Sequence, residues 1–332
     1  MRDEAGSMST QLMTKAYYFL KPVIPWAIRI RIRRLIANRQ RRQFSSSWPI
    51  LPSAARLPEG WPGWPNGKQF AFVVTHDVEG MRGLARCRKL ADLDKAMGIR
   101  SAFYFVPEGE YRVPDSLRTD LEQAGFEVGV HDLHHDGSLY RSEKNFHTQA
   151  QKINLYLKTW RALGFRAGFM FHNLEWLHDL DVLYDASTFD TDPFEPQPSG
   201  VGTIFPFWVP RNGSRGYVEL PYTLPQDSTL LVLLKERTID LWTKKLDWVA
   251  SHGGMVLVNV HPDYMSFDGR PDAWEYQADL YEQLLKHVVT HYGDTCWYAL
   301  SREVAAFAAQ IKPRLAHGTV TSDRRSDAER QA

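Results

Sequence analysis

The sequence has few cysteines and no long apolar run, and both shortages narrow the classes of protein it can encode. Only two cysteines, Cys87 and Cys296, occur in 332 residues, and they fit no metal-binding spacing and no disulfide framework. Acidic and basic side chains interrupt residues 1–30, and no apolar run reaches the length of a signal-peptide core or a spanning helix. We therefore expect a cytoplasmic protein with no transmembrane segment.

The chain also lacks any strong excess of charge. Its formal net charge is +1, so the average electrostatic field does not favour nucleic acid, and we expect no nucleic-acid partner. Aromatic residues are plentiful, with 11 Trp and 14 Tyr. Such side chains suit a large core or a surface on which sugar rings stack, so their number alone does not decide between these uses.

A basic segment precedes the main domain. We divide the chain into an N-terminal extension (1–67), a main domain (68–312) and a disordered tail (313–332). In residues 25–42, Pro25 suits the first turn of a helix. The apolar residues of one helical face are Ile24, Ile28, Ile32, Leu35 and Ile36, and the arginines are Arg29, Arg31, Arg33, Arg34, Arg39, Arg41 and Arg42. Because the segment has no acidic residue, a helix here could lie against anionic lipid at a membrane surface. Alternatively, its apolar face docks on the main domain. Residues 45–67, rich in Pro, Gly, Ser and Trp, are expected to wrap the domain surface as a linker.

From residue 68 onward, short apolar strands alternate with amphipathic helices, which predicts an α/β barrel. The run at residues 70–78 is expected to be a buried parallel strand. Chemically active side chains stand where predicted strands end, namely Asp77 with Glu79, His131, and His261. A barrel gathers such residues at the carboxyl ends of its strands, so we expect them to share one site.

Two pairs of residues in this set point to a metal ion. Asp77 and Glu79 lie two apart, so both point the same way on a strand, where a cation or a shared proton relieves their repulsion. His131 and His135 lie four apart, a spacing that places both imidazoles on one face of a helical turn. Two imidazoles and one carboxylate leave coordination positions open, as in hydrolytic zinc sites and non-haem iron sites.

The order of these motifs resembles the polysaccharide deacetylase superfamily over residues 68–310. Residues 75–79 (THDVE) resemble the first motif, and His131 with His135 resembles the second. Residues 165–168 (FRAG) keep the arginine of the third motif, Arg166, but Gly168 stands where that family has proline. Residues 184–187 (YDAS) and 257–261 (LVNVH) resemble the fourth and fifth motifs. The resemblance implies a distorted (β/α) barrel of about seven strands.

The resemblance also implies roles for individual residues. Asp77 is the expected base, and Glu79, His131 and His135 are the expected ligands of a divalent metal, most readily Zn²⁺. Because the family's two acids are usually adjacent, the roles of Asp77 and Glu79 could be exchanged. His261 is the expected acid, and Arg166 is expected to orient Asp77 and keep it ionised. The expected substrate contacts are His76, Asp185 and Trp208.

These roles predict a metal-dependent hydrolase that removes an acetyl or formyl group from an amino sugar, a glycan or a lipid-linked glycan at the inner membrane face. Two alternatives stay open at this point. The chain is a hydrolase of a non-sugar amide, or it is a catalytically silent relative that binds glycan or lipid, an interpretation that Gly168 favours.

Overall fold

The computed structural model describes residues 26–211 and 216–311. The predictions for residues 1–25 and for the tail 313–332 lie outside these residues. Within the described part, seven α-helices accompany a two-stranded sheet, β9 (Met265–Ser266) with β10 (Tyr276–Gln277), and one curved sheet of nine strands. The strands of this sheet are β1 (Phe70–Val78), β2 (Ala102–Phe105), β3 (Glu127–His131), β4 (Gly164–Arg166), β5 (Tyr184–Asp185), β6 (Phe207–Pro210), β7 (Gly216–Glu219), β8 (Met255–Val260) and β11 (Cys296–Tyr298).

Strand β1 is the centre of the sheet. It pairs in parallel with β8 along one edge, while β11 and β2 pair in parallel with the first and last parts of its other edge. From β2 the sheet continues in parallel through β3, β4, β5 and β7, and β6 adds an antiparallel edge. Thr223 donates its backbone N–H to the carbonyl of Leu257, which brings the segment after β7 back to β8. The predicted α/β architecture, a distorted barrel, is confirmed.

Side chains of β1 alternate between two apolar cores, as the pleat of a strand requires. Ala71 and Val73 point inside the curved sheet, and Phe72 and Val74 point outward beneath the helices. The inner core is completed by Val304 and other residues of α8 (Ser301–Ala308), which contacts β1, β5 and β7. This alternation continues to the carboxyl end of β1 and decides which polar residues face the interior.

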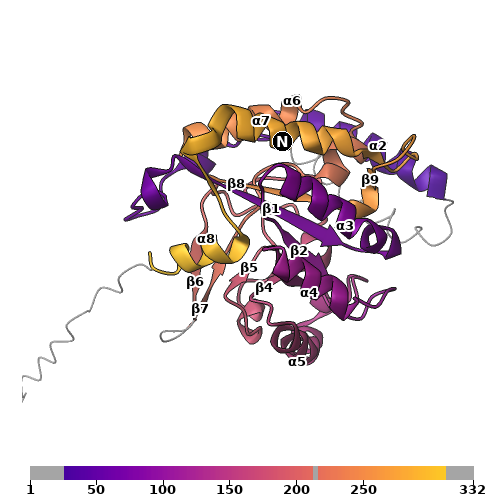
Figure 1. Cartoon of the computed structure of the whole chain (residues 1–332), viewed down its shortest axis with the longest axis vertical. Helices are drawn as coiled ribbons and strands as arrows, with labels where there is room; N and C mark the ends of the chain where they lie inside the picture. The colour runs from indigo at the N-terminus through magenta and orange to yellow at the C-terminus, as the bar shows by residue number, and fades with distance from the viewer. Residues whose placement is uncertain (1–25, 212–215, 312–332) are drawn as a thin grey trace, which may run out of the picture.

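Helices cover the outside of the curved sheet (Figure 1). They are α3 (Met81–Ala96), α4 (Asp115–Gln123), α5 (Glu143–Trp160), α6 (Asp240–Ser251) and α7 (Ala278–Tyr292). A shorter π-helix, η6 (Ser228–Leu233), follows the segment that reaches β8. None of the helices in the described residues combines the length and the apolar character that crossing a bilayer requires.

The N-terminal extension is tied to the barrel more closely than a surface linker would be. Trp48, Ala54 and Trp64 are all buried, the first two in the outer core and Trp64 in the inner core. Residues 45–67 run mostly along the surface as a linker, and their buried tryptophans also supply apolar area to the cores.

Helix α2 (Trp26–Gln43) docks on the barrel through a mostly polar face. Ala37 is buried, Arg34 donates to the carbonyl of Ala273 at 2.6 Å, and Arg41 pairs with Glu236 at 2.5 Å. Leu35, placed by the sequence on the apolar face, is 72% exposed. Of the apolar face that the sequence defines, Ile32 and Ile36 are half-buried and Leu35 is exposed, while Arg34, Ala37 and Arg41 contact the barrel.

Candidate functional site

The carboxyl end of β1 directs two acids inward and one histidine outward. Side chains two residues apart on a strand point to the same face, so Asp77 points to the inner face like Ala71 and Val73. Glu79 lies one residue beyond the strand and keeps the same direction. His76 lies on the outer face, fully buried, with its Nε2 2.7 Å from Oδ2 of Asp94 on α3. The expectation that His76 contacts substrate was wrong, because the pleat of the strand turns its side chain away from the interior.

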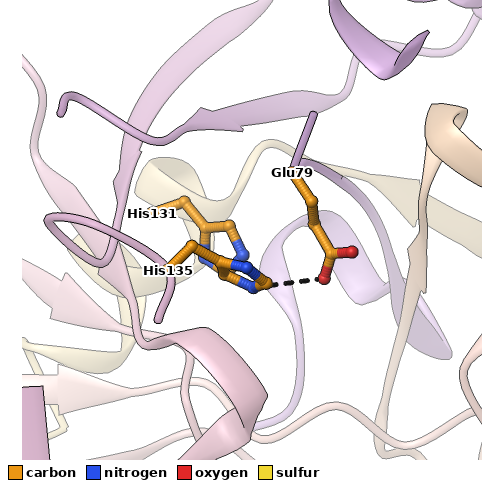
Figure 2. A group of neighbouring side chains, drawn as sticks. All are labelled: Glu79, His131 and His135. Atoms are coloured by element: carbon orange, nitrogen blue, oxygen red, sulfur yellow. Dashed lines mark ion pairs between the residues drawn. The ribbon is translucent and has the colours of Figure 1, made fainter. Parts of the chain in front are cut away.

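Glu79, His131 and His135 form a cluster that could hold a metal ion. One ligand atom from each residue can be chosen so that all three lie within 4.8 Å of one another, and Figure 2 shows the side chains converging. Nε2 of His135 lies 3.2 Å from Oε1 of Glu79. The Nε2 atoms of His131 and His135 are buried without a hydrogen-bond partner in the described part of the chain. Buried polar atoms normally have a partner, so these two lone pairs fit a metal ion.

The tautomer of His131 also fits a ligand role. Its Nδ1–H donates to the backbone carbonyl of Arg166 at 3.0 Å, which leaves Nε2 as the atom that faces Glu79. The donor set of two imidazoles and one carboxylate suits Zn²⁺ or Fe²⁺ and leaves positions open for other ligands.

The two histidines converge through a loop, so the expected helical turn is wrong. Asp132 and His135 have left-handed backbone angles, with φ of 55° and 54°, and residues 132–137 are irregular. Gly168 makes this conformation possible, because an added Cβ there would lie 2.6 Å from Oδ2 of Asp132 and 2.9 Å from Cδ2 of His135. The departure from the family's third motif therefore leaves the cluster intact and gives the His135 ring its space.

Asp77 is held in a different environment from Glu79. Its Oδ1 accepts from Nη1 of Arg166 at 3.1 Å, and its Oδ2 accepts from Nδ2 of Asn259 at 2.7 Å. Burial favours the neutral acid, but Arg166, with His131 and His261, outweighs burial and holds the pKa of Asp77 below its ordinary value. Asp77 is thus an ionised carboxylate at the edge of the metal cluster.

Arg166 holds Asp77 in place from the interior of the barrel. The side chain is fully buried, donates to Thr75 and Asn259 as well as to Asp77, and lies over the ring of Tyr104. It does not line the cavity described below. It is therefore placed to orient Asp77 rather than to touch a bound molecule.

His261 lies across the site and is paired with a second carboxylate. Its Nδ1 is 2.6 Å from Oδ1 of Asp227, and its Nε2 faces Asp77 at 3.8 Å and Glu79 at 3.7 Å. Burial lowers the pKa of His261, but Asp227, with Glu79 and Asp77, outweighs burial and raises the pKa to about 10. The imidazolium form, which has a proton to give, is the one this environment stabilises.

These groups lie on the wall of a cavity of about 180 Å³. Asp77, Glu79, His131, His135 and His261 all line it, so the structure brings together five of the residues that the sequence singled out. Its other walls are largely apolar or aromatic and include Phe169, Phe194, Val232, Leu233, Tyr264 and Trp274. The cavity is smaller than the roughly 300–1,000 Å³ common for drug-sized ligands.

Two other predicted contacts lie elsewhere, and these expectations were wrong. Asp185 points to the outer face of the sheet because its neighbour Tyr184 points inward, and its carboxylate accepts from Ser187. Trp208 lines a separate cavity beside Trp61. Neither side chain lines the cavity that contains Glu79, His131 and His135.

Three functional neighbours were not anticipated from the sequence. Asp227 orients His261, Asn259 binds Asp77, and Tyr264 donates to Oε2 of Glu79 at 3.0 Å. Asn259 had a signal, since a lone amide in the apolar run 255–260 needs a partner when the strand is buried. Asp227 caps η6 and Tyr264 ends the short 3₁₀ helix η7 (Pro262–Tyr264), and no periodic pattern in the sequence marks either residue.

Comparison with solved structures assigns the fold. A protein from Mycobacterium smegmatis, assigned by inference as a polysaccharide deacetylase, matches with a TM-score of 0.59 and 18% identity, over 76% of this chain and 95% of its own. Chitin deacetylase from Colletotrichum lindemuthianum matches with a TM-score of 0.44 and 14% identity, over 72% and 88%. A CE4 family pseudoenzyme from Bacillus anthracis matches with a TM-score of 0.43 and 12% identity, over 73% and 66%. No family model and no curated protein sequence matches this chain.

Proposed function

On the premise that this chain has the polysaccharide deacetylase fold, which the resemblance of its motifs predicted, we propose that it is a metal-dependent hydrolase that removes an acyl group from an N-acylated amino sugar. One observation carries the proposal. Two buried imidazole nitrogens and the Glu79 carboxylate meet on the wall of a cavity that also holds Asp77 and His261. Nε2 of His135 already faces Glu79, but a purely structural cluster would leave Nε2 of His131 unsatisfied, at a cost of about 1–3 kcal/mol.

The chemistry divides among the side chains. Bound at Glu79, His131 and His135, a divalent ion, most readily Zn²⁺, would act as a Lewis acid toward the acyl carbonyl. Asp77, kept ionised by Arg166, accepts the proton of the attacking water. His261, whose Nε2 faces Asp77 across 3.8 Å, gives its proton to the departing amine. Until that transfer, Asp227 stabilises the imidazolium form of His261, and it keeps Nε2 directed at the cavity.

The size and lining of the cavity support the proposed substrate class. Its volume of about 180 Å³ admits an acylated sugar unit, and Phe194 and Trp274 offer faces on which a ring can stack. A soluble or lipid-linked glycan precursor with an acetyl or formyl group fits this space. A small non-sugar amide is the second candidate, since a molecule smaller than a sugar also fits this volume.

The direct test is release of the acyl group. Protein loaded with Zn²⁺ is incubated with N-acetyl and N-formyl amino sugars and with a small ureide, and acetate, formate and amine are measured. His131→Ala is expected to lose both metal and hydrolysis. His134→Ala is the matched control, because His134 binds Glu108 and lies outside the cluster. Hydrolysis that persists in His131→Ala after metal is lost would refute the mechanism, and absence of stoichiometric metal in the wild type would favour a silent relative.

We also propose that helix α2 rests on an anionic membrane surface at the cytoplasmic face. The face of α2 directed away from the barrel carries Leu35, Arg39 and Arg42, all exposed. An apolar residue among arginines suits the boundary between lipid headgroups and acyl chains. Both cysteines are buried and free, which agrees with a reducing compartment. Such a placement would bring the barrel to lipid-linked sugars.

A further inference from the structure

Helix α2 is fixed to the rim of the catalytic cavity at several points. Arg34 donates through Nε to the carbonyl of Val232, at 3.2 Å, and through Nη2 to that of Ala273. Gln40 donates to the carbonyl of Pro193 at 2.8 Å. Val232 lines the cavity itself, and the chain neighbours of the other two acceptors, Trp274 and Phe194, line it as well. The helix is therefore attached to three parts of the cavity wall.

This attachment positions one cation at the cavity. Arg33 lies one residue before Arg34 on α2 and is among the side chains that line the cavity. Of the described residues that line it, Arg33 alone is a lysine or an arginine. Its guanidinium makes no hydrogen bond or ion pair within the described residues, and the side chain is exposed.

None of the acids that line the cavity in the described part of the chain forms an ion pair with Arg33. Asp77 is already paired with Arg166, and Glu79 faces His135 and accepts from Tyr264. Glu195, the third acid of the cavity, accepts from Tyr222 and Gln226. Beside the attachment points at Val232 and Ala273, the wall is formed by Val232, Leu233 and Trp274, which carry no charge. A guanidinium beside an apolar wall can bind a phosphate or carboxylate group through bidentate, charge-assisted hydrogen bonds.

We infer that Arg33 forms an anion subsite at this cavity and that the substrate carries a negatively charged group, a phosphate or carboxylate, beyond the acylated nitrogen. The inference rests on the proposed function, since it adds a charge to the substrate of the same site. It explains why the N-terminal extension is attached to the cavity rim through Arg34 and Gln40. A neutral amino sugar would leave Arg33 unused.

The test compares a charged probe with its neutral counterpart. Binding of N-acetylglucosamine 1-phosphate and of N-acetylglucosamine to the full-length, Zn²⁺-loaded protein is measured by calorimetry at low and high salt. The phosphate is expected to strengthen binding about tenfold or more, as a single charge-assisted hydrogen bond can do, and salt is expected to reduce the gain. Arg33→Gln is expected to abolish the preference, and Arg33→Lys to retain part of it.

The chain offers a matched control on the same helix. Arg31 is exposed and does not line the cavity, so Arg31→Gln removes an equal charge and is expected to keep the preference. Equal affinity for the two probes in the wild type, or an equal loss in both glutamine variants, would overturn the anion subsite. Thermal unfolding of each variant confirms that the helix and barrel remain folded.

The same experiment separates this inference from the proposed function. If the phosphate probe binds through Arg33 but no acylated sugar is hydrolysed, the anion subsite stands and the hydrolase proposal fails. If acylated sugars are hydrolysed and the phosphate brings no gain, the hydrolase proposal stands and the subsite fails. A prenyl phosphodiester of N-acetylglucosamine distinguishes the source of the anion. If the prenyl compound binds more tightly than N-acetylglucosamine 1-phosphate, the anion belongs to a lipid-linked substrate. If the two bind equally, the anion belongs to a soluble sugar phosphate.

Discussion

Asp227 Oδ1 lies 2.6 Å from Nδ1 of His261, and this contact fixes the direction of the imidazole in the cavity. The other oxygen of Asp227 accepts from the backbone N–H of His261 and from the hydroxyl of Tyr276. The carboxylate therefore holds both the main chain and the ring of His261. Because Nδ1 is engaged, Nε2 is the atom that faces Asp77 and Glu79.

Replacing Asp227 with Asn is expected to reduce acyl-group release about 10²- to 10⁴-fold, because an amide neither stabilises the imidazolium nor enforces the tautomer. Metal content should stay the same, since Asp227 is not part of the metal cluster. The rate is measured under saturating Zn²⁺. Tyr276→Phe is the control, because it removes one hydrogen bond from Oδ2 and leaves the contact at Oδ1. Equal rates in Asp227→Asn and the wild type would contradict a role for the pair.

Substitutions of the two acids of the first motif are expected to have different effects, one on metal affinity and the other on hydrolysis. Glu79→Gln should lower Zn²⁺ affinity by an order of magnitude or more, because Glu79 is the carboxylate of the cluster. Asp77→Asn should bind Zn²⁺ nearly as well as the wild type but lose hydrolysis, because its oxygens are engaged by Arg166 and Asn259. Metal content and acyl release are measured on the same samples. The reverse outcome would exchange the two roles.

Gly168 is expected to matter for metal binding more than for folding. In Gly168→Ala the added methyl would meet Asp132 and the His135 ring, so His135 must shift away from Glu79. We expect Zn²⁺ affinity to fall about tenfold, a loss typical of disturbing the groups that hold a ligand. Gly293→Ala is the control, because an added Cβ there meets nothing within 4 Å. Unchanged Zn²⁺ affinity in Gly168→Ala would show that the loop 132–137 adapts.

The stability of the protein should depend on pH through Glu195 on the cavity wall. Burial, together with Asp192, raises the pKa of Glu195 to about 8, while an unfolded chain has an ordinary glutamate pKa near 4.3. Between these values the folded protein keeps a proton that the unfolded chain has released, so the free energy of unfolding falls as pH rises from about 4 to about 8.

Glu195→Gln should flatten this dependence. The amide oxygen can still accept from Tyr222 and Gln226, which both donate to Oε1, and no proton is lost on unfolding. Urea unfolding at several pH values from 5 to 8 measures the slope. Glu122→Gln on the exposed side of α4 is the control and should leave the slope unchanged. A slope in Glu195→Gln as steep as in the wild type would assign the pH dependence to other groups.

The exposed face of α2 should bind anionic vesicles. Removing two charges in Arg39→Gln/Arg42→Gln is expected to weaken binding to phosphatidylglycerol vesicles by about 2 kcal/mol, since each basic residue near such a surface contributes about 1 kcal/mol. Leu35→Ser should weaken it further by removing the apolar contact. Sedimentation with vesicles measures the effect, and Arg56→Gln, exposed outside α2, is the control. Equal binding to phosphatidylcholine vesicles would contradict the electrostatic proposal.

The sequence by itself determined the barrel and the position of its active edge. The apolar run before Asp77 predicted β1, and the period of two already placed Asp77 and Glu79 on one side. Repeated strand and helix patterns required a parallel α/β sheet, whose strand ends meet at one edge. His131 and His261 could therefore be assigned to the same site from local patterns alone.

Tertiary structure decided which polar residues share the cavity. Asp185 faces outward because the inner or outer sense of its short strand depends on how the sheet curls, which no local pattern records. The period of two in β1 already places His76 opposite Asp77 and Glu79. Asp227 comes to the site from the N-terminus of η6, Tyr264 from the 3₁₀ helix η7 (Pro262–Tyr264), and Arg33 from α2. Their places are set by contacts between residues far apart in the chain, such as that of Arg34 with Val232, and only the folded barrel creates those contacts.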